Sequence, residues 1–166
     1  MTTTDDIRPT TGRLEFGSLA PGFLRAMTQL DRAATKELDL AGIDPRVREL
    51  VRIRASQLNG CAYCIDMHTK DARAIGETEQ RIYALPAWRE TPFFTDRERA
   101  ALAWTEAVTR IGDGVPDAVY DQARRHFAEK ELTDLTWAVV AINGWNRVAI
   151  SSRAVPGAYE PSKRAD

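Results

Sequence analysis

Cysteine and histidine are scarce in this chain, which has two of each among its 166 residues. Two cysteines are too few for the disulfide framework of small exported domains, and in a reducing compartment a close pair is typical of catalysis, redox sensing or metal binding. The charge is nearly balanced, with 23 basic and 24 acidic residues and no long block of either sign. This composition excludes the basic footprint of a protein that binds nucleic acid or an anionic membrane.

Long apolar runs are also missing. No stretch approaches the ~18 uninterrupted apolar residues of a transmembrane helix, and Met1 to Thr11 contain no apolar signal-peptide core. We therefore expect a protein of the cytoplasm, with no membrane partner. A chain of this size fits one domain and buries roughly 70% of the surface that it exposes when unfolded. We expect no metal, disulfide or cofactor to be needed for the core.

Apolar residues recur at helical spacing from Pro21 onward, and no segment has the alternation of a strand. The pattern predicts an all-α fold, a compact bundle of about six to seven helices. Residues 1–20 are expected to form an N-terminal arm, residues 21–156 the helical domain, and residues 157–166 a loose polar tail. Capping residues and prolines predict that helices start near Pro21, Asp44-Pro45, Cys61, Glu79, Thr95, Pro116 and Thr133.

Both cysteines and one histidine fall within eight consecutive positions. If Cys61 lies near the start of a helix, Cys64 at i+3 and His68 at i+7 share one face of it. The partial positive charge of the helix N-terminus and a neighbouring imidazole or thiol would lower a cysteine pKa from its usual ~8.5. Two thiols at this spacing can also close a disulfide, so one can attack a peroxide and the other can resolve the product.

Other interpretations of this motif stay open. A structural disulfide is disfavoured, because so small a ring removes little entropy from the unfolded chain. A zinc site would use Cys61, Cys64 and His68, but a fourth ligand is hard to find, since His126 lies on a different predicted helix. His68 alone is also compatible with an ordinary, partly buried histidine. Thioredoxin-like chemistry is excluded, because that motif needs a βαβ setting.

Glu49 lies on the preceding predicted helix, twelve residues before Cys61. A tight Asn59-Gly60 turn between the two helices would let this acid reach His68. The carboxylate would then hold the imidazole tautomer and help to move protons to and from the sulfurs. Taken alone, a glutamate between arginines more often is a solvated helix charge.

These residues together resemble a known family. Glu49, Cys61-Ala62-Tyr63-Cys64 and His68, with the later AINGWNRVAIS segment (141–151), resemble the alkylhydroperoxidase AhpD-like branch of the carboxymuconolactone decarboxylase superfamily. The resemblance covers roughly residues 21–156. It implies an all-helical protein that assembles into a homotrimer or homohexamer with sites near subunit contacts.

The resemblance also assigns roles. It implies that Cys64 is the attacking thiolate and forms the sulfenate, that Cys61 is its disulfide partner and proton donor, and that His68 and Glu49 form a proton relay. Tyr63 stands where the best-known members carry a histidine, and a residue between the thiols shapes the surface that meets a redox partner.

The sequence thus favours a thiol-dependent peroxidase or disulfide reductase, with a hydroperoxide as substrate and an external dithiol or partner redox protein as reductant. Two alternatives remain. One is acid–base decarboxylation of a small carboxylated substrate, as in the decarboxylase branch of the superfamily. The other is a non-catalytic redox sensor or zinc-stabilised interaction module.

Overall fold

The computed structural model describes residues 12–161, which fold into helices joined by short connections. The α-helices are α1 (Phe16–Leu19), α2 (Pro21–Leu40), α3 (Pro45–Asn59), α4 (Ala62–Ala74), α5 (Glu79–Ala84), α6 (Asp96–Thr109), α7 (Asp117–His126) and α8 (Glu129–Ser152). Two 3₁₀ segments, η2 (Leu85–Glu90) and η3 (Ile111–Asp113), follow α5 and α6. No strand occurs within residues 12–161. The prediction of an all-α fold is confirmed.

Most of the predicted helix starts agree with the structure to within one residue. The Asp44 carboxylate accepts the N–H of Arg46 at the start of α3, and Thr95 and Glu98 form a capping box at the start of α6. The last helix differs, because α8 begins at Glu129 rather than near Thr133. The Thr133 hydroxyl does not cap a helix but donates to the Glu129 carbonyl one turn back, at 2.8 Å.

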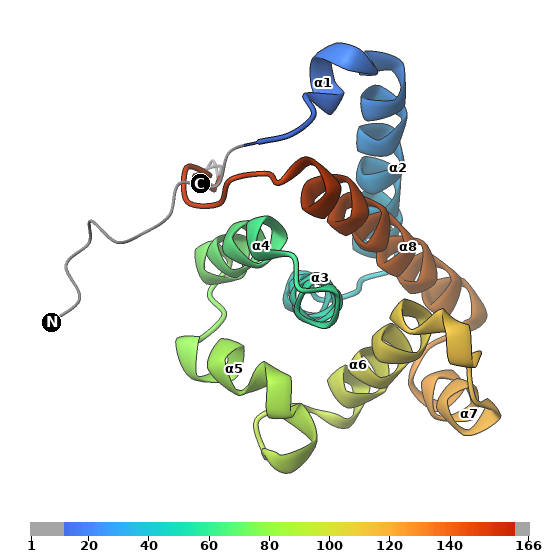
Figure 1. Cartoon of the computed structure of the whole chain (residues 1–166). Helices are drawn as coiled ribbons and strands as arrows, with labels where there is room; N and C mark the ends of the chain where they lie inside the picture. Colours follow the sequence, from blue (N-terminus) through green and yellow to red (C-terminus); the bar gives the residue numbers. More distant parts are fainter. Residues whose placement is uncertain (1–11, 162–166) are drawn as a thin grey trace, which may run out of the picture.

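Helix α3 is the centre of the domain. It packs against α4, α6 and α8, and Figure 1 shows it almost end-on between these three helices. Its side chains are buried on several sides, and Leu50, Val51 and Ile53 are almost fully inaccessible. Burial of each such side chain contributes about 1.5–3 kcal/mol. Because α3 is held on three sides, Glu49 on this helix has a rigid support.

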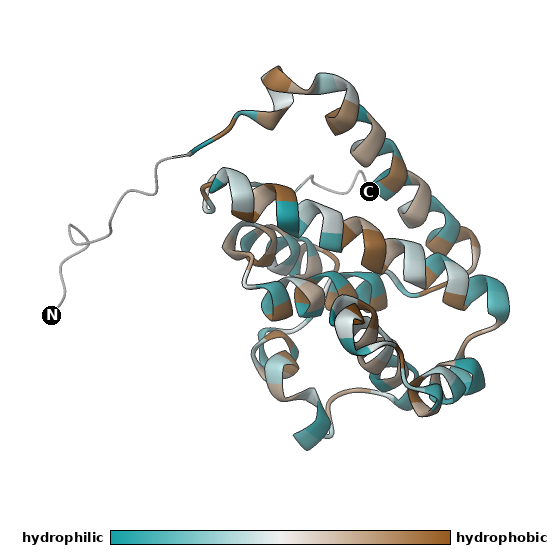
Figure 2. Cartoon of the chain, turned by 45° about the vertical axis from the view of Figure 1, so that its right-hand side comes forward, coloured by the Kyte–Doolittle hydropathy of each residue, from teal (hydrophilic) through white to brown (hydrophobic). Residues whose placement is uncertain are grey.

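Helix α2 lies along α8 at the edge of the domain. In Figure 2, hydrophilic and hydrophobic residues are mixed along the helices, as expected of amphipathic elements with one packed face. None of the described helices is long and apolar enough to cross a bilayer.

The chain ends return to the domain in the described part. The N–H of Arg13, in the predicted arm, donates to the Ser152 carbonyl at 2.8 Å, whereas residues 1–11 lie outside the described residues. After α8, the N–H of Gly157 donates to the Asp66 carboxylate at 3.0 Å, and Lys70 donates to the Gly157 and Tyr159 carbonyls. The prediction of a loose tail is therefore wrong for Gly157 to Tyr159. Residues 162–166 lie outside the described part of the chain.

Candidate active site

The turn between α3 and α4 brings the four predicted site residues into one region. Gly60 adopts a left-handed conformation with φ 70°, which ends α3 and reverses the chain. Cys61 is the N-cap residue of α4, and Cys64 and His68 lie one and two turns further along that helix. Cys61, Cys64, His68 and Glu49 are only 1%, 1%, 6% and 3% exposed. The group is therefore shielded from bulk water.

Glu49 and His68 form a hydrogen-bonded pair. The Nδ1 of His68 lies 2.9 Å from Glu49 Oε2, and Arg52 and Arg48 donate to Glu49 Oε1 at 3.0 and 3.3 Å. Burial alone would raise the pKa of Glu49, but the hydrogen bond with His68 and the charges of Arg52, His68 and Arg48 outweigh it and lower the pKa to about 2. An ionised Glu49 accepts a hydrogen bond from the Nδ1–H of His68, which leaves Nε2 as the basic nitrogen of the ring. Glu49 is thus not a solvated helix charge.

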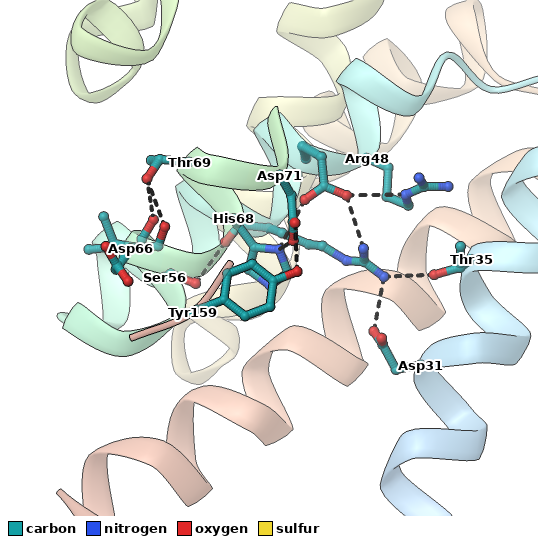
Figure 3. Close-up of polar contacts among 12 residues, drawn as sticks. Asp31, Thr35, Arg48, Ser56, Asp66, His68, Thr69, Asp71 and Tyr159 are labelled. Carbon is teal, nitrogen blue, oxygen red and sulfur yellow. Dashed lines mark hydrogen bonds and ion pairs between the residues drawn. The ribbon is translucent and has the colours of Figure 1, made fainter. Parts of the chain in front are cut away.

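Arg52 connects this pair to helix α2. Its Nη2 donates to Asp31 Oδ1 at 2.9 Å and to Thr35 Oγ1 at 2.8 Å (Figure 3), while Nη1 holds Glu49. The sequence analysis does not assign Arg52 to the site. Its spacing of three residues from Glu49 on a helix is the one local signal that the two side chains can meet.

The two thiols are not equivalent. The adjacent thiol of Cys64, acting as a donor toward the Cys61 thiolate, is the main influence that lowers the pKa of Cys61 to about 6, against the opposing effect of burial. The N–H groups of Cys64 and Tyr63 and the amide of Asn146 act in the same direction. Donation to Cys61, together with burial, raises the pKa of Cys64 above its usual range.

Asn146 is a site residue that the sequence reasoning missed. It lies on α8, is fully buried, and receives a hydrogen bond at Oδ1 from Asn59 at 2.8 Å. Its own Nδ2 donates to the Ser56 hydroxyl at 3.0 Å. Since Asn59 fixes which end of the amide is the acceptor, the amide hydrogens of Asn146 face the sulfurs and lower the pKa of both cysteines. An asparagine in a helix gives no sequence signal of such a role.

A cavity of about 420 Å³ opens onto this group between α2, α4, α8 and the chain after α8. Cys64 and His68 line it, whereas Cys61 does not. Its other lining side chains are mostly apolar: Tyr63, Met67, Trp145, Val148, Ala149 and Ala154, with Thr28, Asp31 and Ser152. None of the described residues that line it is a lysine or arginine. The cavity therefore suits an uncharged, apolar molecule that approaches Cys64.

Glu49, His68 and Asp71 offer ligand atoms within 4.8 Å of one another, and this cluster of the described residues includes neither cysteine. Arginines already neutralise Glu49, and the Tyr159 hydroxyl donates to Asp71. The donor set thus fits hydrogen bonding within the protein better than a cation. Zinc on the thiols would still need a fourth ligand, and His126 lies at the end of α7, a helix that packs on α6 and α8.

The fold and site together define an all-helical protein with a buried thiol pair beside a carboxylate–histidine pair. Residues 21–107 match the profile of the carboxymuconolactone decarboxylase family. The chain belongs to this family, in its AhpD-like branch.

Individual relatives agree with this placement. The uncharacterised protein YdfG of Bacillus subtilis is 44% identical over 140 residues, which are 84% of this chain and 92% of that protein. The crystal structure of ATU0492 from Agrobacterium tumefaciens, whose description names antioxidant defence and AhpD, is 37% identical, with a TM-score of 0.84 over 90% of this chain and 100% of that chain. A peroxidase-related protein from Ralstonia eutropha with an AhpD core shares the fold, with a TM-score of 0.72 at 21% identity, over 86% of this chain and 74% of that chain.

Proposed function

We propose that the protein is a thiol-dependent peroxidase, in which Cys64 reacts with an organic hydroperoxide and Cys61 closes a disulfide with it. The observation that carries this proposal is the position of the thiols: Cys64 and His68 line one apolar cavity, and Cys61 lies behind Cys64 as the more acidic partner. Both cysteines are unpaired in the structure, as the reduced enzyme requires.

The more acidic cysteine, Cys61, does not line the cavity, whereas Cys64, which does, has the raised pKa. With a Cys61 pKa of about 6, the pair carries a single proton at neutral pH. We assign the proton that the pair has lost to His68, which lines the same cavity as Cys64. The remaining proton can sit on either sulfur. When it moves to Cys61, the thiolate is on Cys64, the sulfur that faces the cavity.

The reaction then runs in three balanced steps. The Cys64 thiolate attacks the terminal peroxide oxygen, the O–O bond breaks, and the alkoxide takes the proton of Cys61 to leave as an alcohol. The Cys61 thiolate attacks the Cys64 sulfenic acid, the S–O bond breaks, and hydroxide takes the proton held by His68 to leave as water. An external dithiol reduces the disulfide, is itself oxidised, and returns one proton to the thiol pair and one to His68.

The same cavity disfavours the decarboxylase alternative. A carboxylated substrate needs a cationic partner, yet the lining residues include the acidic Asp31 and no lysine or arginine among those described. Arg52, behind the wall, is already bound to Asp31 and Glu49. Among the described lining residues, a small carboxylated substrate would therefore find no cationic side chain to bind its carboxylate.

The test is hydroperoxide consumption with a dithiol as reductant. We expect Cys64→Ser to abolish both turnover and sulfenic acid formation. Cys61→Ser should lose turnover but still form one equivalent of sulfenic acid at Cys64, detected by a trapping reagent and mass spectrometry. His68→Asn should slow the reaction, whereas His126→Asn, which changes the half-buried histidine of α7, should not. Full turnover in both cysteine variants would contradict the proposal.

The same assay separates catalysis from sensing. A redox sensor would form the Cys61–Cys64 disulfide with oxidant but would show no sustained turnover with any dithiol. A protein that acts mainly as a disulfide reductase would turn over a disulfide partner faster than a hydroperoxide, with the same dependence on both cysteines.

A further inference from the structure

Residues 157–159, which follow α8, are hydrogen-bonded to α4, and we call this segment the strap. Arg153, with φ 54°, ends α8, and Gly157, with φ 110°, turns the chain toward α4. Asp66 accepts the Gly157 N–H, and Lys70 donates to the carbonyls of Gly157 and Tyr159 at 3.1 and 2.9 Å. These bonds hold residues 157–159 in place and fix the position of the Tyr159 side chain.

The strap places a phenol beside the proton relay. The Tyr159 hydroxyl donates to Asp71 Oδ1 at 2.7 Å, and Asp71 Oδ2 lies 3.7 Å from His68 Nδ1, the nitrogen that also bonds Glu49 (Figure 3). Burial, followed by the hydrogen bond and charge of Asp71, raises the pKa of Tyr159 to about 12. The hydroxyl therefore stays protonated and remains a donor at every pH at which the thiols react.

We propose that Tyr159 is a positioning residue, whose hydroxyl engages Asp71 and so leaves the Nδ1–H of His68 to Glu49. This proposal rests on the proposed function for its catalytic consequence, but its effect on the imidazole exists whether or not the protein reduces peroxides. Two carboxylates compete for one ring N–H, and the phenol satisfies the one that lies farther away.

The charges around His68 decide the direction of the effect. Glu49 on α3 is neutralised by Arg48 and Arg52. Asp31 on α2 is bound to Arg52, and Cys64 on α4 shares its proton with Cys61. Asp71 has no arginine or lysine among its described ion pairs, and the Tyr159 hydroxyl is its close donor. Without that hydroxyl, the full charge of Asp71 acts on the ring and favours the imidazolium form of His68.

Tyr159→Phe tests this directly, because it removes the hydroxyl and keeps the ring. The chain has two histidines, so NMR can follow the ring signals of His68 with His126 as an internal reference. We expect the imidazolium signals of His68 to persist to higher pH in Tyr159→Phe than in the wild type, while the signals of His126 are the same in both proteins. The pH profile of turnover should change in the same direction as the His68 signals. The matched control is Tyr83→Phe, at a tyrosine that is 74% exposed.

A double-mutant cycle with Asp71→Asn isolates the coupling. If Tyr159 acts through Asp71, Tyr159→Phe should shift the His68 signals in the wild-type background and leave them unchanged when residue 71 is neutral. An equal shift in both backgrounds, or a His68 titration like that of Tyr83→Phe, would overturn the proposal. A different outcome would overturn the proposed function alone. In that case neither the wild type nor the variants would turn over peroxide, but Tyr159→Phe would still shift the His68 signals.

Discussion

Replacement of Glu49 by glutamine should destabilise the protein in a manner that depends on pH. The substitution keeps the size of the side chain but removes the negative charge that faces His68, Arg52 and Arg48. Arg52 retains Asp31 and Thr35 as partners. The Glu49 side chain is nearly inaccessible, so solvent cannot replace the lost interactions.

The magnitude follows from the depressed pKa. Glu49 has a pKa of about 2 in the folded protein, against an ordinary value of 4.5 for a glutamate. A difference of this size corresponds to about 3 kcal/mol in the free energy of unfolding at pH 7. Because the folded-state pKa is the lower one, this contribution is complete above the unfolded value and is lost as the pH falls from 4.5 toward 2. At pH 3 roughly half of it remains.

The assay is urea unfolding of the wild type and of Glu49→Gln at pH 7 and pH 3. We expect a difference of about 3 kcal/mol at pH 7 that shrinks to about half of that at pH 3. Glu79→Gln is the control, since it removes the same charge from an exposed ion pair with Arg73 and should cost less than about 0.5 kcal/mol at either pH. A Glu49 effect that is equal at both pH values would refute the reasoning.

Three further predictions test the thiols, the cavity and the assembly. Alkylation of the reduced protein by iodoacetamide should have a midpoint near pH 6, from the lowered pKa of Cys61, and Cys64→Ala should move it upward because alanine removes the thiol donor; an unshifted midpoint near ~8.5 in the wild type would contradict this. Cumene hydroperoxide should be a better substrate than a fatty acid hydroperoxide, and Asp31→Asn should narrow the gap; equal kcat/KM for both in the wild type would argue against a cavity that disfavours anions. Sedimentation should show the homotrimer or homohexamer that we propose from the family, with exposed apolar residues such as Phe23 and Trp137 as candidate contacts; a monomer at all concentrations would rule this out.

The sequence predicts those parts of the fold that short-range chemistry decides. Asp44 with Pro45, and Thr95 with Glu98, set helix starts through bonds that span two or three residues, so their positions are readable from the chain alone. The predicted start of α8 is too late, because Thr133 has a good capping side chain whereas Ala128, the observed N-cap residue, has none. There the Glu131 carboxylate accepts the Ala128 N–H and takes over the role of the cap.

The candidate site likewise has one part that the sequence predicts and one part that it does not. Cys61, Cys64 and His68 lie at the start of α4 or within it. The two-residue turn at Gly60 packs α3 against α4, so Glu49 on α3 lies close to this group. Asn146 and Tyr159 reach the site from segments more than 70 residues away in the chain, through packing of α8 and the strap on α4. No local pattern marks either residue, because their roles depend on which helix faces they meet.

The unequal thiols follow from the same geometry and give a reason why the proposed reaction uses both cysteines at this spacing. Cys61, as the N-cap residue, is near the free N–H groups that begin α4, so acidity belongs to the first position of the motif. Cys64 lies one turn further in, where the helix face meets the cavity and His68, so access belongs to the second. A single cysteine at position 61 would keep these N–H donors but would not reach the cavity, and a single cysteine at position 64 would reach the cavity but would not be acidic. A proton shared between two sulfurs three residues apart lets the accessible thiol draw on the acidity of the buried one, which is why we keep the attacking role at Cys64.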